Sequence, residues 1–229
     1  FLNLIFNFNC KMILRISGYP KLNIIRKFFW KVTSKKLYLI TCPTQDLQKE
    51  ISSLNIYDKE KLKFLPDAII NIEDFLEQKI KSKEILFEKK IILSVGRLTK
   101  QKNFKYLINE LANFLKENEN YNLIILGDGE EKKELMKLIN NLNLNEKVFL
   151  LGFKDNPISY MVKADILVLS SIWEEVGFVI VEAALSNLLV VSSDCPNGPK
   201  EFLSCGRAGY LFENNKINAL KNTFLSIKD

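Results

Sequence analysis

Histidine is absent from the 229 residues, and cysteine is scarce. The absence of histidine removes the commonest general base and the commonest metal ligand near neutral pH. The cysteines show neither the paired spacing of a metal site nor the density of a disulfide framework. They are Cys10, Cys42, Cys195 and Cys205. We therefore expect reduced thiols and a cytoplasmic protein.

Acidic residues are absent from the start of the chain up to Asp46. The charged residues before that point are Lys11, Arg15, Lys21, Arg26, Lys27, Lys31, Lys35 and Lys36. Aromatic side chains lie between them, which favours contact with anionic lipid headgroups or a phosphorylated lipid acceptor at the inner membrane face. A solvated basic face over an ordinary core explains the same pattern. Nucleic acid is a competing partner, but no motif supports it, so we predict none.

A long hydrophobic run is also missing from the start of the chain. The apolar stretch 1–8 is too short to span a bilayer, and it lacks the basic start and cleavage site of a secretory signal. Because the first residue is not Met, we expect that part of the protein precedes it. The hydrophobic content of 47% and charged content of 26% are typical of a soluble globular chain, long enough for one large or two small domains.

Strand-like and helix-like segments alternate along the chain. We expect strands at 11–16, 37–41, 62–65, 91–95, 123–126, 148–151, 166–169 and 188–192. We expect helices at 45–54, 104–115, 135–142, 156–164 and 199–205, and one that starts at Gly177. This alternation predicts a parallel doubly wound sheet, which binds ligands at the carboxyl ends of its strands. Residues 72–88 are charged and weakly periodic, which favours a linker between domains.

The turn before Gly177 carries the first candidate site. If Gly177 starts a helix, the free N–H groups and the positive end of its dipole form an anion site, most often for phosphate. Glu174 lies in the turn and Glu182 one turn into the helix, so both can face one crevice and accept hydrogen bonds from neutral hydroxyls, as on a sugar and a ribose. Alternatively, Glu174 is a solvated loop acid and Glu182 complements the helix dipole.

The second candidate site combines two cations. Arg97 follows a strand end and Lys102 precedes the next helix, so a fork-shaped guanidinium and a mobile ammonium can converge on a diphosphate. Two exposed loop cations are the alternative. The glycines around Asp128 are a weak signal, because such pairs more often mark a tight turn than a phosphate cradle. Cys195 has no partner that would make it a nucleophile.

These motifs resemble those of a known family. The pattern Ser170-Ser171-x-x-Glu174-x-x-Gly177-x-Val179-x-x-Glu182-Ala183 is similar to the Glu-x7-Glu signature of the retaining nucleotide-sugar glycosyltransferases of family four, which have the GT-B fold. Gly-Arg-Leu at 96–98, Gln-Lys-Asn at 101–103, Gly-x-Gly at 127–129 and Gly-Pro-x-Glu at 198–201 follow the family order. The usual Glu-Gly-Phe-Gly turn reads Glu-Glu-Val-Gly at 174–177, a departure at the sugar-facing turn.

The resemblance implies an α/β fold of GT-B type with Rossmann-like doubly wound parallel sheets. Residues 1–71 would be the latter part of the N-terminal, acceptor-side domain. Residues 72–88 would be a linker, and 89–229 the donor-binding domain. A GT-B epimerase or phosphorylase, or a fragment that binds a nucleotide sugar without turnover, are the alternatives.

The resemblance also implies residue roles. Arg97 and Lys102, next to Gly96, would hold the diphosphate, and Gly127 would support them. Phe153, before Asn156 and Pro157, would line the nucleobase pocket, or would instead close a hydrophobic core. Glu174 would hold the sugar hydroxyls, Glu182 the ribose, and the helix start at Gly177, Phe178 and Val179 would offer N–H groups.

The resemblance implies partners as well. The donor would be a UDP- or GDP-linked sugar, used with retention and without metal or other cofactor. The acceptor would be a glycan or lipid-linked glycan of polysaccharide or lipopolysaccharide biosynthesis.

Overall fold

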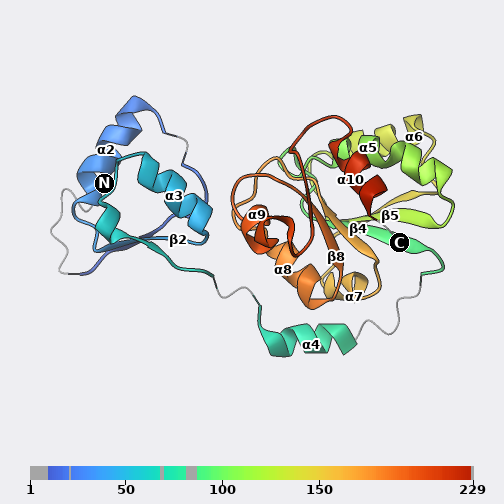
Figure 1. The fold of residues 1–229 in the computed structure, drawn as a ribbon, viewed down its shortest axis with the longest axis horizontal. Coiled ribbons are helices and arrows are strands. Elements are labelled where there is room, and N and C mark those ends of the chain that lie inside the picture. The colour runs from blue at the N-terminus through green and yellow to red at the C-terminus, as the bar shows by residue number, and fades with distance from the viewer. Residues whose placement is uncertain (1–9, 21, 68–69, 81–86, 228–229) are drawn as a thin grey trace. The chain divides into compact units, whose positions relative to one another are not determined.

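The computed structural model describes residues 10–20, 22–67, 70–80 and 87–227. The chain divides into two compact units, residues 1–68 and 69–229 (Figure 1). Each unit has its own hydrophobic core. Among the described residues, no helix has the length and apolar character needed to cross a membrane.

The first unit is a three-stranded parallel sheet with two helices. Its strands β1 (Ile13–Arg15), β2 (Leu39–Cys42) and β3 (Leu62–Phe64) lie in chain order. The helices α2 (Ile24–Ser34) and α3 (Gln45–Ser53) cover the same side of this sheet (Figure 1), and a 3-10 turn, η1 (Lys59–Lys61), precedes β3. Thr44 caps α3 as expected, because its hydroxyl accepts a 3.2 Å hydrogen bond from the Leu47 amide.

The second unit is built on a six-stranded parallel sheet in the order β6-β5-β4-β7-β8-β9. Its strands are β4 (Lys90–Val95), β5 (Tyr121–Leu126), β6 (Val148–Gly152), β7 (Ile166–Leu169), β8 (Leu189–Ser193) and β9 (Tyr210–Phe212). The chain winds outward from β4 to β6, returns to β7 beside β4, and continues to β9. The order therefore reverses between β4 and β7, and the carboxyl ends of these two strands mark the expected ligand site.

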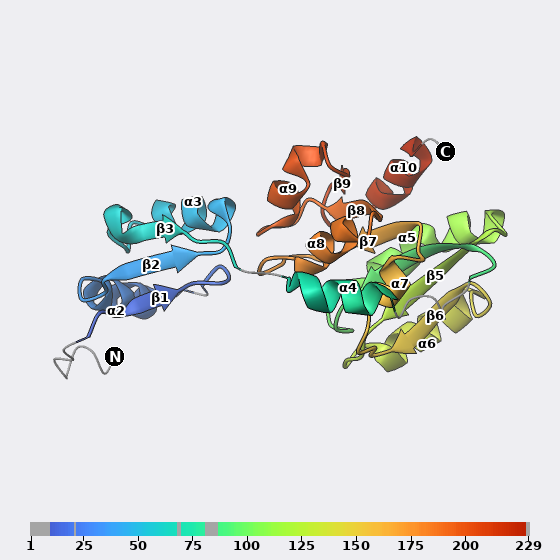
Figure 2. The same cartoon turned by 90° about the horizontal axis from the view of Figure 1, so that it is seen from below.

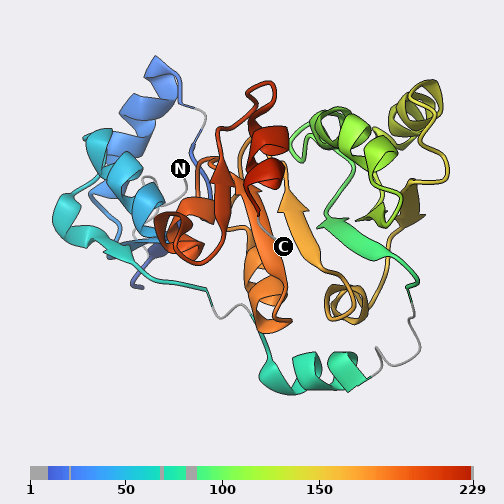
Figure 3. The same cartoon turned by 45° about the vertical axis from the view of Figure 1, so that its right-hand side comes forward.

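Helices cover both faces of this sheet, as Figures 2 and 3 show. Successive residues of each strand point to opposite faces of the sheet. On one face, Ile92 and Val168 pack with α5 (Phe104–Glu117), α6 (Lys132–Asn141) and α10 (Ala219–Ser226). Leu93 and Leu167 pack on the other side. The helices there are α4 (Ile72–Ile80), α7 (Ile158–Met161), α8 (Phe178–Leu185) and α9 (Pro199–Phe202), the last followed by the 3-10 turn η3 (Ser204–Gly206). The strands are thus buried on both faces, which explains their continuous apolar sequences.

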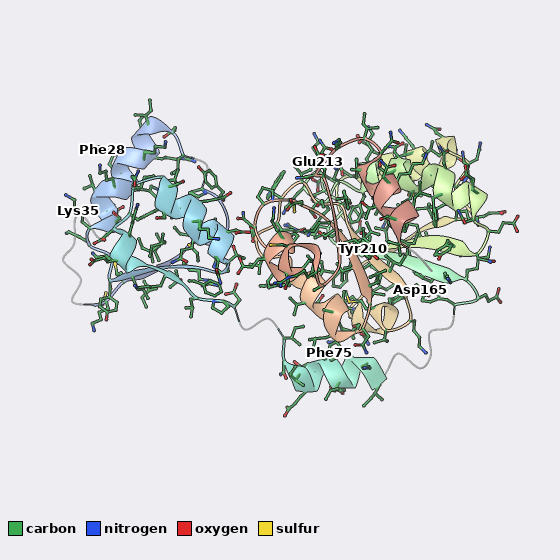
Figure 4. The ribbon with its side chains drawn as sticks, in the orientation of Figure 1. Phe28, Lys35, Phe75, Asp165, Tyr210 and Glu213 are labelled. Atoms are coloured by element: carbon green, nitrogen blue, oxygen red, sulfur yellow. The ribbon has the colours of Figure 1, made fainter. Side chains whose placement is uncertain are left out.

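Several elements were not predicted from the sequence. The predicted linker 72–88 begins with α4, whose Phe75 is buried in the second unit against the layer of α7 and α8 (Figure 4). Most of its other residues are charged or polar and only Phe75 is buried, so the hydrophobic periodicity of the segment is weak. Residues 24–34, to which no element was assigned, form α2, and the side chain of Asn23 caps it at 2.8 Å. Strand β9 and helix α10 were likewise not predicted.

Candidate functional site

Glycine loops join the carboxyl ends of β4, β5 and β6. The Gly96 amide donates to Leu126 at 2.9 Å, and the Gly127 amide donates to Gly152 at 2.9 Å. Gly127 has a φ of 138°, and a Cβ there would lie 1.9 Å from the carbonyl oxygen of Gly96. Only glycine permits this approach. Gly127 therefore shapes the site by letting two loops touch.

Arg97 lies over a hollow at this edge of the sheet. The hollow measures about 410 Å³, and Gly96, Gly127, Asp128 and Phe153 share its lining with Arg97. Arg97 is exposed, and within the described residues its guanidinium has neither a hydrogen bond nor an ion pair. Phe153 is 72% exposed, so it does not close a core.

Glu182 lines a second, adjoining hollow of about 400 Å³. Phe153, Lys154 and Pro157 line both hollows, so the loop after β6 contributes to the wall of each. Glu182 is half-buried on α8, and this burial raises its pKa above the ordinary value. A half-buried carboxylate beside an open hollow can accept hydrogen bonds from hydroxyl groups of a ligand.

Lys102 and Glu174 form a buried ion pair with an N–O distance of 2.6 Å. Their side chains are only 15% and 6% exposed. The stem of Lys102 passes Gly96, because a Cβ at Gly96 would lie 3.1 Å from its Cε. Neither side chain lines the two hollows described above. Of the four charged residues predicted for the site, Lys102 and Glu174 therefore form a buried ion pair. Arg97 and Glu182 each line a hollow.

Backbone contacts hold this pair in place. The loop after β4 is joined to the loop after β7, because the Ile172 amide donates to Gln101 at 2.8 Å and the Ser170 hydroxyl donates to Lys102 at 2.8 Å. The Gln101 side chain donates to the Trp173 carbonyl at 2.9 Å. Lys102 and Glu174 are thus positioned by two loops that meet where the strand order reverses.

Gly177 starts α8 as expected, with a φ of 80°. Phe178 is exposed and Val179 packs on the core beneath, so the first turn of the helix stands at the surface of the site. The first amides of a helix have no partner within it and can receive an anion. The Glu174 amide donates to Pro196 at 3.1 Å, and a Cβ at Gly198 would lie 2.0 Å from the Val176 carbonyl, so the turn rests on the loop after β8.

The loop after β8 also holds Cys195. Burial raises the pKa of its thiol to about 12, so the thiol stays protonated near neutral pH. This state agrees with the expectation that Cys195 is not a nucleophile. Asn197 beside it is buried, and its Oδ1 has no hydrogen-bond partner within the described part of the chain.

Two contributors to the site were not predicted from sequence. The hydroxyl of Ser171 donates to Glu174, although Ser171 had been assigned only a place in the motif. Lys154 lines both hollows. The signal for Ser171 is its spacing of three residues before Glu174, whereas a lysine in a loop carries no such signal. Among the described residues, no cluster of three or more Cys, Asp or Glu could hold a metal ion, and metal independence stays a prediction.

The parallel sheet, its strand order and the loops at its carboxyl edge are those of a GT-B fold, of which this chain forms a part. Comparison with known proteins then gives the family. Residues 76–229 match the family described as Glycosyl transferases group 1, and the chain belongs to it.

Individual proteins agree with this assignment. The chain is 35% identical over 190 residues to an uncharacterized glycosyltransferase of Methanocaldococcus jannaschii, covering 81% of this chain and 46% of that protein. It is 31% identical over 218 residues to the N-acetylgalactosamine-N,N'-diacetylbacillosaminyl-diphospho-undecaprenol 4-alpha-N-acetylgalactosaminyltransferase of Campylobacter jejuni, covering 92% and 58%. The chain thus spans about half the length of these relatives.

Among solved structures, Anabaena HepE in complex with UDP-glucose superposes with a TM-score of 0.73 and 23% identity, covering 93% of this chain and 61% of that one. This likeness shows the fold.

Proposed function

We propose that the chain is the donor-binding part of a glycosyltransferase that takes its sugar from a nucleoside diphosphate sugar with retention. The observation that carries this proposal is the pair of adjoining hollows, with Arg97 in one and Glu182 in the other. A diphosphate next to Arg97 and a ribose next to Glu182 would place the nucleoside along Phe153, whose exposed ring is free to contact the base.

The proposed mechanism is electrostatic. Negative charge grows on the diphosphate as the sugar bond breaks, and Arg97, Lys102 and the first amides of α8 would stabilise it. Lys102 directs one hydrogen bond to Glu174 and has two further N–H donors for phosphate. The cations would fill the role that a metal ion has in other sites. Losing one such contact typically lowers turnover about 10²–10³-fold.

The substrates follow from the relatives in outline. The Anabaena protein was solved with UDP-glucose, and the name of the Campylobacter enzyme specifies an acceptor linked to diphospho-undecaprenol. We extend both features to this chain: a UDP-linked sugar as donor, with GDP sugars as the alternative, and a glycan or lipid-linked glycan as acceptor.

The exposed residues of helix α2 in the first unit support the proposal of a lipid-linked acceptor. Helix α2 exposes Ile24, Ile25 and Phe28 at 87%, 67% and 64%, with Lys27 between them and Lys31 one turn further on (Figure 4 labels Phe28 and Lys35). The first 68 residues carry 12 Lys and Arg against 5 Asp and Glu. Apolar side chains with flanking cations are typical of helices that lie in an anionic membrane surface. We therefore propose peripheral contact with the inner membrane face.

Calorimetry with UDP and GDP, followed by a transfer assay with the matching sugar nucleotides, tests the function. We expect one nucleotide to bind, and a product whose anomeric configuration, read by NMR, equals that of the donor. Binding without transfer would favour a donor-binding fragment. Absence of binding to every nucleotide tested, or an inverted product, would contradict the proposal.

A further inference from the structure

The carboxylate of Glu174 receives two hydrogen bonds on the same oxygen. The Lys102 ammonium donates to Oε1 at 2.6 Å, and the hydroxyl of Ser171 donates to the same atom. Ser171 is 0% exposed and lies just after β7. Two donors on one oxygen, one charged and one neutral, fix the side-chain conformation of a buried carboxylate more firmly than the ion pair alone.

The other carboxylate oxygen, Oε2, remains available. Within the described residues no hydrogen bond reaches Oε2, and it is not one of the enclosed side-chain oxygens that lack a partner. A carboxylate can accept about four hydrogen bonds. Oε2 is therefore an open acceptor, suited to a neutral hydroxyl group.

The position of Ser171 is itself fixed by the sheet. The Ser193 hydroxyl, at the end of β8, donates a 2.7 Å hydrogen bond to the backbone carbonyl of Ser171. Both serines are fully buried. A continuous set of contacts thus runs from β8 through the end of β7 to the carboxylate, so the sheet helps to fix the orientation of Glu174.

We propose that Ser171 is a positioning residue for donor recognition. It holds Oε1 so that Oε2 of Glu174 faces a hydroxyl of the donor sugar, while Lys102 keeps its other N–H groups for the diphosphate. This inference rests on the proposed function, because it assumes that Glu174 contacts the sugar. It predicts that Ser171 affects recognition of the sugar and leaves recognition of the nucleotide unchanged.

The test compares Ser171→Ala with the wild type by calorimetry, using UDP alone and whichever of UDP-glucose and UDP-N-acetylglucosamine the wild type binds more tightly. We expect the affinity for the UDP sugar to fall about tenfold. The affinity for UDP should stay within about twofold. Ser171→Thr, which keeps the hydroxyl, should recover most of the loss.

Ser94→Ala is the matched control. Ser94 is also buried, and its hydroxyl donates at 2.6 Å to the Val168 carbonyl, away from Glu174. This variant should keep both affinities. Thermal unfolding of each variant verifies folding. If Ser171→Ala does not fold, Ser193→Ala replaces it and should show the same selective loss in weaker form.

The outcomes separate this inference from the function on which it rests. If the wild type binds neither UDP nor a UDP sugar, the proposed function fails. If the wild type binds both and Ser171→Ala keeps both affinities, or loses both equally, Ser171 does not position the carboxylate.

Discussion

At the scale of single residues, Lys102 and Glu174 depend on each other in the folded protein. Each is a charged group with little exposure, and burial of an unpaired charge is strongly unfavourable. Removing one member of a buried pair typically costs about 3–5 kcal/mol, because the other charge stays buried without a partner. Arg97 differs, because it is exposed and lacks an ion pair within the described residues.

The two cations therefore predict different outcomes. Lys102→Ala should lower the free energy of unfolding by about 3–5 kcal/mol. Arg97→Ala should change it by less than about 0.5 kcal/mol and should weaken UDP binding by at least about tenfold, because a charge-assisted hydrogen bond contributes about 1.5–3 kcal/mol. Denaturant titration and calorimetry measure both quantities. Lys100→Ala, exposed in the same loop, is the control and should change neither.

Glu182 predicts a pH-dependent stability. Burial raises the pKa of Glu182 in the folded protein above its ordinary value of 4.5, so its contribution to stability is present below about pH 4.5 and is lost as pH rises through the folded pKa. Glu182→Gln removes this dependence. The variant should therefore be more stable than the wild type at pH 7, and the difference should shrink towards pH 4, as followed by thermal unfolding. Glu146→Gln, which is exposed, should show no such trend.

The charged residues of the site could be predicted from the sequence, but the contacts between them could not. Arg97 and Glu182 could be selected because cations and acids at strand ends and helix starts are visible in the motif. The pairing of Lys102 with Glu174 joins residues 72 positions apart, and it depends on two loops meeting at the reversal of strand order. The exposure of Phe153 depends equally on packing, which the sequence does not specify.

At the scale of elements, the glycine loops set how closely neighbouring strand ends approach. Gly127→Ala would place a methyl group against the Gly96 carbonyl in a backbone conformation that suits glycine. Gly152 also has a positive φ, of 72°, but a Cβ there meets nothing within 4 Å. Gly152→Ala is therefore the control for backbone strain alone, which costs about 1–2 kcal/mol.

We expect Gly127→Ala to lose clearly more stability than Gly152→Ala in denaturant titration, and to lose UDP affinity because the hollow beside Arg97 changes shape. Equal losses in the two variants would show that the contact with Gly96 is unimportant.

From the exposed apolar and basic residues of helix α2, we predict that the first unit binds anionic membranes. Lys27→Glu with Lys31→Glu should reduce binding to phosphatidylglycerol vesicles at least tenfold, because each basic residue near an anionic surface contributes about 1 kcal/mol. Binding to phosphatidylcholine vesicles should be weak in both proteins. Lys59→Glu with Lys63→Glu changes the net charge of the unit equally, and these residues lie outside α2. Equal loss in this control would point to general electrostatic attraction.

Five of the six strands of the second unit were predicted to within two residues, because runs of Ile, Leu and Val end at glycine or serine. The sixth, β9, was not predicted. Helix α4 was missed because one phenylalanine fixes it to the unit, and a single anchor gives no periodicity. Helix α2 was missed although its apolar residues recur at helical spacing (Ile24, Ile25, Phe28, Phe29 and Val32). The basic and aromatic composition of the segment was interpreted as a binding surface, and its periodicity was not used.

At the scale of the whole molecule, separate hydrophobic cores predict separate unfolding of the two units. A ligand stabilises the unit that binds it by about 2.7 kcal/mol at a hundred times its Kd. UDP should therefore raise the melting temperature of the unit containing residues 69–229 by roughly 5–10 °C. Differential scanning calorimetry measures this shift, and Arg97→Ala should diminish it. No shift at saturating UDP would contradict the location of the site.

The GT-B fold was predicted from several weak motifs in the right order, because each motif marks the end of a strand and together they specify the winding of one sheet. Domain boundaries were harder to predict. They depend on which hydrophobic core each segment joins. The boundary between the two units lies between residues 68 and 69, just before α4.

The contact between Gly198 and Val176 has a consequence for protein engineering. Because the backbone of one loop lies directly against that of the other, neither can be reshaped while its neighbour keeps its native form. Replacing the turn 174–177 by the corresponding turn of a homologue should therefore succeed only when segment 194–198 is exchanged together with it. Libraries aimed at altered sugar preference should vary the two segments together.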